Sequence, residues 1–251
     1  NGYLTHDAEL NLDFWEYVYK EWISKGILKS EDISSQYHSM NLNFLRDQFD
    51  KSRRNLNLEC IDLLYLHNSA EAQIPDIGKE EYLRRLEKVF EFYEDLRRQG
   101  KIRYYGLATW SCFRLPIDHK EHLSLEEVVH LAKKVSGEGF KFIQLPFNLL
   151  MREADELLNQ RVEGKLYTLF DAAKILKIGV FTSAPLLQGK LLHLPIKFRN
   201  LTKVRNLTKA QICLQFVRSN PKVLSCLVGQ KTKDHLEENL KLAYMEPLND
   251  Y

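Results

Sequence analysis

The sequence lacks the marks of several common protein classes. It has only four cysteines, and no two of them form a C-x-x-C pair (Cys60, Cys112, Cys213 and Cys226). Isolated cysteines favour reduced thiols in a cytosolic protein over a disulfide framework or a zinc site. The longest apolar runs have the length of a strand and fall short of the roughly 18 residues that a membrane span needs. We therefore expect a cytoplasmic protein that makes no membrane contact.

The sequence also lacks an excess of charge of either sign. Lysine and arginine total 36 residues against 34 aspartates and glutamates, which gives a net charge of +2. A chain with this balance has no global basic field to attract nucleic acid. His119 and His122 form an H-x-x-H, but no acidic or cysteine partner stands at ligand spacing. This pattern favours a solvated loop over a metal site.

What the sequence does contain is a regular alternation of strand-like and helical segments, which is typical of βα units. Its 251 residues, of which 44% are hydrophobic, predict a single α/β domain over residues 1–251. The predicted strands cover residues 60–66, 104–108, 140–147, 180–183 and 223–228. The predicted helices cover residues 14–25, 45–56, 83–99, 124–135, 165–177, 208–219 and 233–243.

Several of these elements carry specific local signals. Two helices begin with capping boxes, at Ser124-Leu-Glu-Glu127 and at Thr208-Lys-Ala-Gln211. The first strand is a nearly continuous apolar run, which predicts burial on both faces, and His67 follows it directly. In the helix over residues 83–99, apolar residues recur at helical spacing and predict a buried stripe of Leu86, Val89, Phe90, Tyr93 and Leu96.

Two phosphate-binding fingerprints are missing, which helps to choose between the two common α/β architectures. No G-x-G-x-x-G follows a strand and no G-x-x-x-x-G-K-[ST] occurs, so a (β/α)8 barrel is favoured over a doubly wound sheet. Five strands cannot close an eight-stranded barrel, and the chain also lacks an initiator methionine. We therefore expect an N-terminally incomplete TIM barrel that holds about five of the eight βα units, strands 4–8.

Five segments carry motifs of a known family in the family's order. They are Leu45-Arg-Asp-Gln-Phe-Asp-Lys-Ser-Arg-Arg-Asn-Leu-Asn-Leu-Glu-Cys-Ile-Asp-Leu-Leu-Tyr-Leu-His67-Asn68, Gly100-Lys-Ile-Arg-Tyr-Tyr-Gly-Leu-Ala108, Phe142-Ile-Gln-Leu-Pro-Phe-Asn148, Ser183-Ala-Pro-Leu-Leu-Gln-Gly-Lys190 and Val228-Gly-Gln-Lys-Thr-Lys-Asp-His-Leu-Glu-Glu-Asn239. Together they resemble the aldo-keto reductase family. The resemblance implies a TIM barrel that binds a nicotinamide cofactor without a Rossmann fingerprint. It also implies reversible hydride transfer between NADPH and a small aldehyde or ketone.

The resemblance further implies a catalytic group of an Asp, a Tyr, a Lys and a His. In that group the Tyr protonates the developing alkoxide, the Lys lowers the Tyr pKa, the Asp holds the Lys, and the His orients the carbonyl. In this chain, His67 alone matches a position of the group, and the other three would align before Asn1. Two interpretations follow. The protein is a carbonyl reductase whose other catalytic residues lie upstream, or it is a non-catalytic nucleotide-binding or regulatory subunit.

For the nicotinamide carboxamide, the resemblance implies polar groups at the ends of two strands. Thr109 and Gln144 occupy these positions, and the Gln144 amide can both donate to and accept from a carboxamide. Where the family usually has a Ser-Asn pair, this chain has Thr109-Trp110. Trp110 is too large to replace Asn as a cofactor contact, so we expect it to line the substrate pocket. Thr182 stands where many members have an aromatic ring that stacks on the nicotinamide, so stacking by this residue is not expected.

Two further segments resemble the regions that hold the cofactor's phosphates and adenine. The basic loop at residues 197–209 is expected either to attract the pyrophosphate or to be solvated. The resemblance implies NADP(H) as the cofactor. Because His235 stands where many NADP-preferring members have an Arg, NAD(H) is the alternative. The predicted pyrophosphate contacts are Ser183, Pro185, Leu186, Gln188, Gly189 and Lys190. The predicted contacts to the 2′-phosphate and adenine are Gln230, Lys231, Thr232, Glu238 and Asn239.

Overall fold

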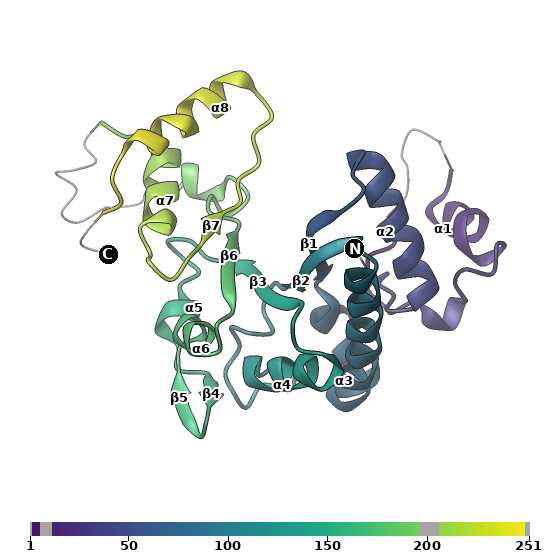
Figure 1. Cartoon of the computed structure of the whole chain (residues 1–251). Coiled ribbons are helices and arrows are strands. Elements are labelled where there is room, and N and C mark those ends of the chain that lie inside the picture. The colour runs from purple at the N-terminus through teal and green to yellow at the C-terminus, as the bar shows by residue number, and fades with distance from the viewer. Residues whose placement is uncertain (1, 6–11, 196–205, 249–251) are drawn as a thin grey trace. The chain divides into compact units, whose positions relative to one another are not determined.

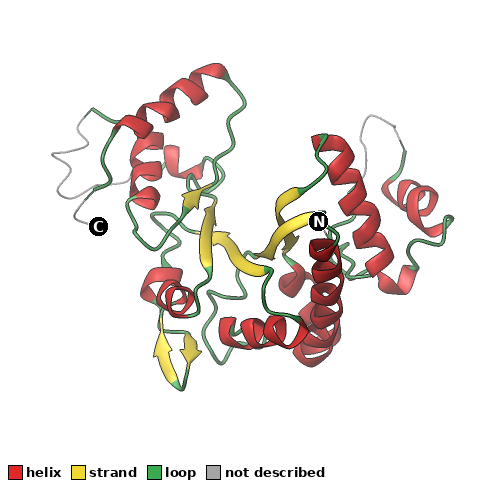
Figure 2. Ribbon diagram, viewed as in Figure 1, coloured by secondary structure: helices red, strands yellow, loops and turns green. Residues whose placement is uncertain are grey.

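The computed structural model describes residues 2–5, 12–195 and 206–248, and the chain divides into two compact units, Asn1–Phe142 and Ile143–Tyr251. The main sheet is ordered β1-β2-β3-β6-β7, and the boundary between the units falls within β3. Because this order follows the chain without reversal, the sheet is wound in one direction, as in a βα barrel. Its strands are β1 (Ile61–His67), β2 (Ile102–Ala108), β3 (Phe140–Pro146), β6 (Gly179–Ser183) and β7 (Ser225–Cys226) (Figure 1, Figure 2).

β1 and β2 form the parallel pair that positions the candidate site in the first unit. Their register runs from Ile61↔Ile102 to His67↔Ala108, so the two strands end at the same level. The predicted strand over residues 60–66 is confirmed with a shift of one residue, and His67 is the last residue of β1. Asn68 then leaves the strand in a left-handed conformation (φ 46°), and its N–H donates to the Ala108 carbonyl at 2.6 Å.

The helix predicted over residues 14–25, before β1, is confirmed as far as Ile23, but its type changes after Val18. α1 (Phe14–Val18) is followed by a π-helical turn (Tyr19–Ile23). This wider turn carries Trp22 into the core, where its ring contacts Phe44 at 5.2 Å between centroids. The Trp22 indole N–H also donates to Asp47 Oδ2 at 2.9 Å. Packing of one large aromatic therefore coincides with the change in helix type.

α2 (Leu42–Leu56) and α3 (Ser69–Arg98) pack against each other in the first unit (Figure 1). α2 begins before the predicted residue 45 because the Asn41 side chain caps it by accepting two backbone N–H bonds from the first turn. α3 begins well before the predicted residue 83, and Gly78 (φ 76°) divides it into two segments. The second segment contains the predicted stripe, which is confirmed because all its members are buried: Leu86, Val89, Phe90, Tyr93 and Leu96.

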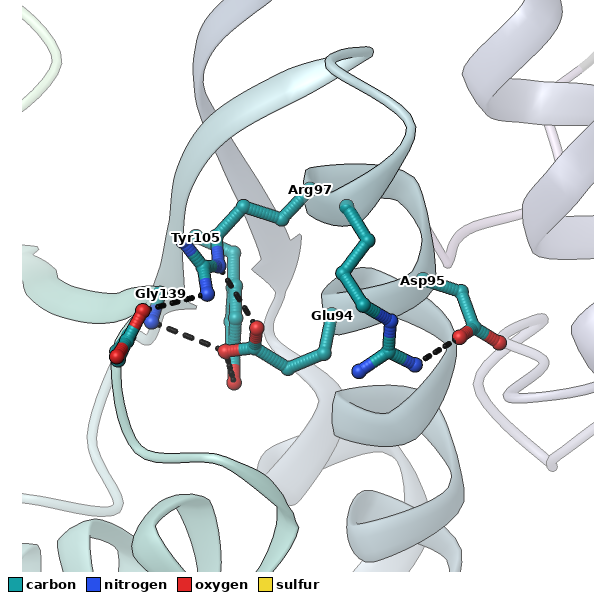
Figure 3. Close-up of polar contacts among 7 residues, drawn as sticks. Glu94, Asp95, Arg97, Tyr105 and Gly139 are labelled. Atoms are coloured by element: carbon teal, nitrogen blue, oxygen red, sulfur yellow. Dashed lines mark hydrogen bonds and ion pairs between the residues drawn. The ribbon is translucent and has the colours of Figure 1, made fainter.

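A buried carboxylate network ties α3 to the amino end of β3 (Figure 3). Glu94 Oε1 accepts bonds from the Tyr105 hydroxyl at 3.1 Å and from Gly139 N at 2.9 Å. Glu94 Oε2 accepts from Arg97 Nε at 2.7 Å, and Arg97 also pairs with Glu138 at 2.8 Å. Burial by itself raises the pKa of Glu94, but the bonds from its neighbours outweigh burial and hold this pKa below its ordinary value of 4.5. The amino end of barrel strands serves stability, not chemistry.

In the second unit, a hairpin replaces the start of a predicted helix. β4 (Gln160–Val162) pairs antiparallel with β5 (Lys165–Tyr167), so the helix predicted from residue 165 is wrong over its first turn. The connecting residues Glu163 and Gly164 have φ values of 48° and 81°, the left-handed conformations that a two-residue hairpin turn needs. α6 (Leu169–Ile175) begins only after this hairpin.

Two helices begin where their caps predict. α4 (Leu125–Val135) follows Ser124, whose hydroxyl accepts a bond from Glu127 N at 3.3 Å. α7 (Lys209–Arg218) follows Thr208, and both halves of its capping box are formed. These local signals are reliable because the partner groups lie three residues apart and need no tertiary contact.

The last elements are shorter than predicted. The strand predicted over residues 223–228 is reduced to β7, because the Val223 N–H turns back to the Asn220 carbonyl at 3.1 Å. The flanking N–H groups of Leu224 and Leu227 still donate to the Val180 and Thr182 carbonyls of β6, at 2.9 and 2.8 Å. The last helix ends early as α8 (Lys233–Leu240) and continues as a 3-10 turn (Lys241–Tyr244). Among the described residues, no helix is both long and apolar enough to cross a membrane. The remaining short elements are α5 (Glu153–Glu156) and 3-10 turns at Ser30–Asp32 and Lys190–Leu192.

Candidate functional site

The first unit places His67 at the carboxyl end of β1, in register with the end of β2. The side chain is half-buried, and its ring meets the Tyr3 ring edge to face, with centroids 5.6 Å apart and planes at 71°. Burial lowers the pKa of His67, and the negative charge of Glu71 opposes that shift. The imidazole is therefore neutral at pH 7 and has one N–H to donate, which is the group that a carbonyl oxygen requires.

A second histidine, His38, supports the same end of β1. It is fully buried, and its Nε2 lies 3.1 Å from the backbone carbonyl oxygen of His67. Because a carbonyl oxygen can only accept, Nε2 carries the proton and Nδ1 accepts from Gln73 Nε2 at 3.2 Å. Burial lowers the pKa of His38 to about 3, which agrees with a neutral ring. The Tyr3 ring lies 5.1 Å from the His38 ring and completes the cluster.

The loop after β2 carries the two predicted site residues of the neighbouring strand. Thr109 is buried, whereas Trp110 is 39% exposed. Glu71 Oε1 accepts backbone N–H bonds from Trp110 and Ser111 at 2.8 Å each and from Cys112 at 3.0 Å. Trp110 thus offers a partly exposed aromatic surface in the loop after β2, the strand that pairs with β1, and its place in a substrate pocket stays a prediction.

In the second unit, Asn148 ties the loop after β3 to the loop after β6. Its Nδ2 donates to the Ala184 carbonyl at 2.9 Å, and its Oδ1 accepts from Leu150 N and Met151 N at 3.0 Å each. Gln144 lies on β3 and is half-buried. The fully buried Asn148 therefore fixes the backbone that follows the predicted carboxamide contact.

Burial alternates along β6, which settles where Thr182 points. Val180 and Thr182 are buried, whereas Phe181 and Ser183 are partly exposed. The Thr182 hydroxyl donates to the Ser225 carbonyl at 3.5 Å. A residue at position 182 is thus enclosed on the covered face of the strand, and the open face carries Ser183, which begins the predicted pyrophosphate loop.

The loop after β6 concentrates left-handed backbone. Ala184, Leu187, Gln188 and Gly189 have φ values of 52°, 47°, 56° and 85°. Each such non-glycine residue costs roughly 1–2 kcal/mol, and strain of this kind gathers at ligand-binding loops. Two turn bonds hold the loop, from Leu187 N to the Ala184 carbonyl and from Gly189 N to the Leu186 carbonyl, both at 2.9 Å. Of the predicted contacts, Pro185 is buried and the others are half-buried or exposed: Ser183, Leu186, Gln188, Gly189 and Lys190.

The amino end of α8 carries the predicted contacts to the 2′-phosphate. Gln230 and Lys231 are exposed in the turn before the helix. Thr232 is the N-cap, and its hydroxyl accepts a bond from His235 N at 3.2 Å. The first backbone N–H groups of a helix and a nearby ammonium group form a suitable surface for a phosphate.

The two predicted adenine contacts on α8 have different environments. The Glu238 carboxylate is hydrogen-bonded to the Thr208 hydroxyl, so it already joins α8 to the cap of α7. Asn239 Oδ1 is buried and has no hydrogen-bond partner among the described residues. Asn239 thus keeps a free acceptor, which the exocyclic amine of adenine could satisfy.

The predicted basic loop is described only at its end, because residues 196–205 lie outside the described residues. Lys209 Nζ donates to the Leu192 carbonyl at 3.0 Å and to the Leu194 carbonyl at 3.1 Å. These two bonds hold the Lys209 ammonium group against backbone of its own unit. We therefore do not assign Lys209 to a phosphate.

Residue types that bind metals do not converge in the described part of the chain, where no group of three or more His, Cys, Asp or Glu side chains could hold an ion. His119 Nδ1 accepts a bond from Glu121 N at 3.1 Å, and His122 is buried. The four cysteines are free thiols, and burial raises the pKa of Cys213 and of Cys226 to about 11.

Sequence reasoning missed the residues that surround His67, namely Tyr3, His38, Gln73 and Glu71. For Glu71 one signal was available, since it is an acidic residue in the first turn of the helix that follows a histidine-ended strand. Its backbone partners, however, lie 39 to 41 residues further along the chain. No local pattern spans that separation.

Comparisons with known proteins agree on one family. The model of the aldo/keto reductase family matches residues 23–251. The uncharacterized oxidoreductase YqkF of Bacillus subtilis (strain 168) is 24% identical over 220 residues, which are 82% of this chain and 62% of that protein.

Solved structures show the same fold. The holo form of aldo-keto reductase AKR11C1 from Bacillus halodurans superposes with a TM-score of 0.54 at 17% identity, covering 85% of this chain and 65% of that one. An aldo/keto reductase from Klebsiella pneumoniae in complex with NADP and acetate superposes with a TM-score of 0.53 at 20% identity. The match covers 82% of this chain and 61% of that one. The chain thus spans less than two thirds of the length of these relatives.

Proposed function

The chain belongs to the aldo/keto reductase family, and we propose that the protein is an NADP(H)-dependent oxidoreductase that reduces aldehydes or ketones to alcohols. The observation that carries this proposal is His67, a half-buried histidine with a lowered pKa at the carboxyl end of β1. Barrel enzymes bind their substrates at that end of the strands. A neutral imidazole N–H there can donate to the carbonyl oxygen and stabilise the negative charge that develops on it.

On the substrate side, the proposal uses the ends of β1 and β2. His67 orients the carbonyl group, and the partly exposed Trp110 lines the pocket. Thr109 is proposed as a cofactor contact. His67 is the one member of the catalytic group that we assign within this chain, and the proposed activity is that of the whole protein, including the Asp, Tyr and Lys that the family resemblance implies.

On the nucleotide side, the second unit fits a nicotinamide dinucleotide. The left-handed loop after β6 and the amino end of α8 suit phosphate groups, and Asn239 has an unsatisfied acceptor. When bound, the cofactor supplies the hydride. We assign Gln144 to the carboxamide, and the other proposed contacts are Ser183, Pro185, Leu186, Gln188, Gly189 and Lys190 for the pyrophosphate, Gln230, Lys231 and Thr232 for the 2′-phosphate, and Glu238 and Asn239 for adenine.

The proposal is tested by titrating the purified chain with NADPH and, in parallel, with NADH, while protein fluorescence is followed. We expect both nucleotides to quench the fluorescence and NADPH to bind more tightly. Failure of both to bind would contradict the cofactor assignment, and equal affinities would contradict the NADP preference. In the whole protein, binding without oxidation of NADPH by any of a panel of aldehydes and ketones would contradict the reductase activity.

Lys231 provides a residue-level test of the same proposal. Replacing it by Ala removes a charge-assisted bond to the 2′-phosphate, worth about 1.5 kcal/mol, so the NADPH Kd should rise about tenfold. The NADH Kd should not change, because NADH has no 2′-phosphate. Lys177 is a matched control for net charge, since it lies in the loop before β6 and has no proposed cofactor contact. An equal effect of K231A on both nucleotides would contradict the assignment.

A further inference from the structure

Glu71 uses its carboxylate in an unusual way for a residue in the first turn of a helix. Acidic residues at this position commonly bond to N–H groups of their own helix. The Asn68 side chain makes no capping bond at this helix start. Glu71 nevertheless reaches the next βα loop, where its Oε1 accepts backbone N–H bonds from Trp110, Ser111 and Cys112. One carboxylate oxygen thus gathers three successive amides from the end of the neighbouring strand.

These bonds determine the position of the loop. Bonds from N–H groups to an ionised carboxylate are about twice as strong as neutral ones, and successive amides that converge on an anion form a rigid nest. The Arg114 guanidinium closes the same loop, with Nε and Nη2 donating to the Trp110 carbonyl at 3.1 and 2.7 Å. Trp110 is therefore held at both its N–H and its carbonyl group. Its side chain, in contrast, is 39% exposed.

The same carboxylate also lies close enough to act on the catalytic candidate. Glu71 follows His67 by four residues, across the turn that Asn68 makes out of β1. Its charge opposes the effect of burial on the His67 imidazole. Glu71 thereby connects the two elements of the substrate side, the end of β1 and the loop after β2.

We propose that Glu71 is a positioning residue for the carbonyl substrate, because its carboxylate fixes the backbone of Trp110, Ser111 and Cys112 beside the end of β1. This inference rests on the proposed reductase function. The role proposed for Glu71 is to hold the loop, and it requires no contact between Glu71 and the substrate. The kcat/KM for a carbonyl substrate should therefore depend on the length of side chain 71 and on its ability to accept hydrogen bonds. The Kd for NADPH should depend on neither.

Three substitutions at Glu71 distinguish the effect of side-chain length from the effect of side-chain charge. E71Q keeps an oxygen acceptor at the same reach, E71D keeps the charge but is one methylene shorter, and E71A removes both. We expect E71A and E71D to lower kcat/KM for a carbonyl substrate about a hundredfold, the cost of a misplacement of about 1 Å. E71Q should lose less than about tenfold, and the NADPH Kd should stay unchanged in all three. Glu80, an exposed residue on the same helix, is the control as E80Q.

Amide hydrogen exchange tests the loop without any need for activity. In the unmodified chain, the N–H groups of residues 110–112 should be protected, and in E71A they should exchange at least about tenfold faster while the rest of the sheet stays protected. Unchanged exchange at these amides would overturn the inference whether or not the protein is a reductase. Faster exchange with unchanged kcat/KM in an active enzyme would also overturn it. Inactivity of the unmodified protein would instead contradict the proposed function, while the exchange result still reports on the loop.

Discussion

Helix α3 carries two carboxylates, Glu71 near its beginning and Glu94 near its end, and they behave differently. Glu94 is fully buried, accepts bonds from Tyr105 and Gly139, and is paired with Arg97 at 2.7 Å. Glu71 accepts three backbone N–H bonds, and no cation pairs with it in the described part of the chain. Glu94 thus has a positively charged partner, and Glu71 is held by backbone N–H groups.

The difference follows the two ends of the strands. Glu94 acts at the amino end of β3, where barrels place residues that support stability. Glu71 acts at the carboxyl ends of β1 and β2, next to His67, at the end of the strands where barrel enzymes bind their substrates. A neutralised network suits a structural role, because a buried charge without a partner is costly. A carboxylate that accepts several backbone amides can orient a loop and also act electrostatically on a nearby imidazole.

The largest effect on stability is expected at Glu94. E94A leaves the Tyr105 hydroxyl and the Gly139 N–H without their acceptor and removes the partner of Arg97. Loss of one partner from a buried network typically costs about 3–5 kcal/mol, so the free energy of unfolding in urea should fall by that amount. Glu91 is the matched control, because it pairs with Lys88 at the same three-residue spacing but is exposed. E91A should cost less than about 1 kcal/mol, and equal effects would contradict the network's role.

A smaller effect is expected at Gly139, which lies against the same network. A Cβ at this position would come within 2.4 Å of Tyr105 Cε1 and 2.8 Å of Glu94 Oε1. G139A should therefore lower the unfolding free energy by about 1–3 kcal/mol, the usual cost of overpacking. At Gly229 an added Cβ meets nothing within 4 Å, so G229A serves as the control and should stay within about 0.5 kcal/mol. Similar losses in both variants would show that the contact at Gly139 is unimportant.

The smallest effect is expected in the pH dependence of stability. The folded-state pKa of Glu94 lies below its ordinary value of 4.5, so its contribution is present above that pH and is lost as the pH falls through the folded pKa. Urea unfolding at neutral pH and at a pH below 4.5 should show a larger loss for the unmodified chain than for E94Q, which has no titrating group there. E91Q should lose as much unfolding free energy between the two pH values as the unmodified chain does. An equal loss in E94Q would contradict the contribution of Glu94 to the pH dependence.

Much of the architecture could be predicted because its signals are local. The apolar run that ends in His67, the stripe on the second half of α3 and the caps at Ser124 and Thr208 each depend on residues within a few positions of one another. The alternation of strands and helices and the family motifs predicted a TIM barrel, and the family match and the solved structures agree with that fold. That about five of eight units are present stays a prediction.

What could not be predicted depends on contacts distant in sequence or on backbone conformation. The hairpin of β4 and β5 was hidden because its apolar residues also fit a helical pattern, and its left-handed Glu163 is a residue type that rarely signals a turn. In the loop after β6, Leu187 and Gln188 adopt left-handed conformations that only Gly189 suggests from sequence. The cluster around His67 joins His38 and Gln73, which lie 35 residues apart in the chain.

The catalytic role proposed for His67 can be measured against an exposed histidine of the same unit. H67A and H130A should be compared in the whole protein, in the NADPH-dependent reduction of an aldehyde, with NADPH binding measured in parallel. His130 is an exposed histidine on α4 and is the matched control. Removing a donor to the developing oxyanion should lower kcat about 10²–10³-fold in H67A and leave its NADPH affinity unchanged, whereas H130A should behave like the unmodified protein. Equal kcat values for H67A and H130A would contradict the catalytic role of His67.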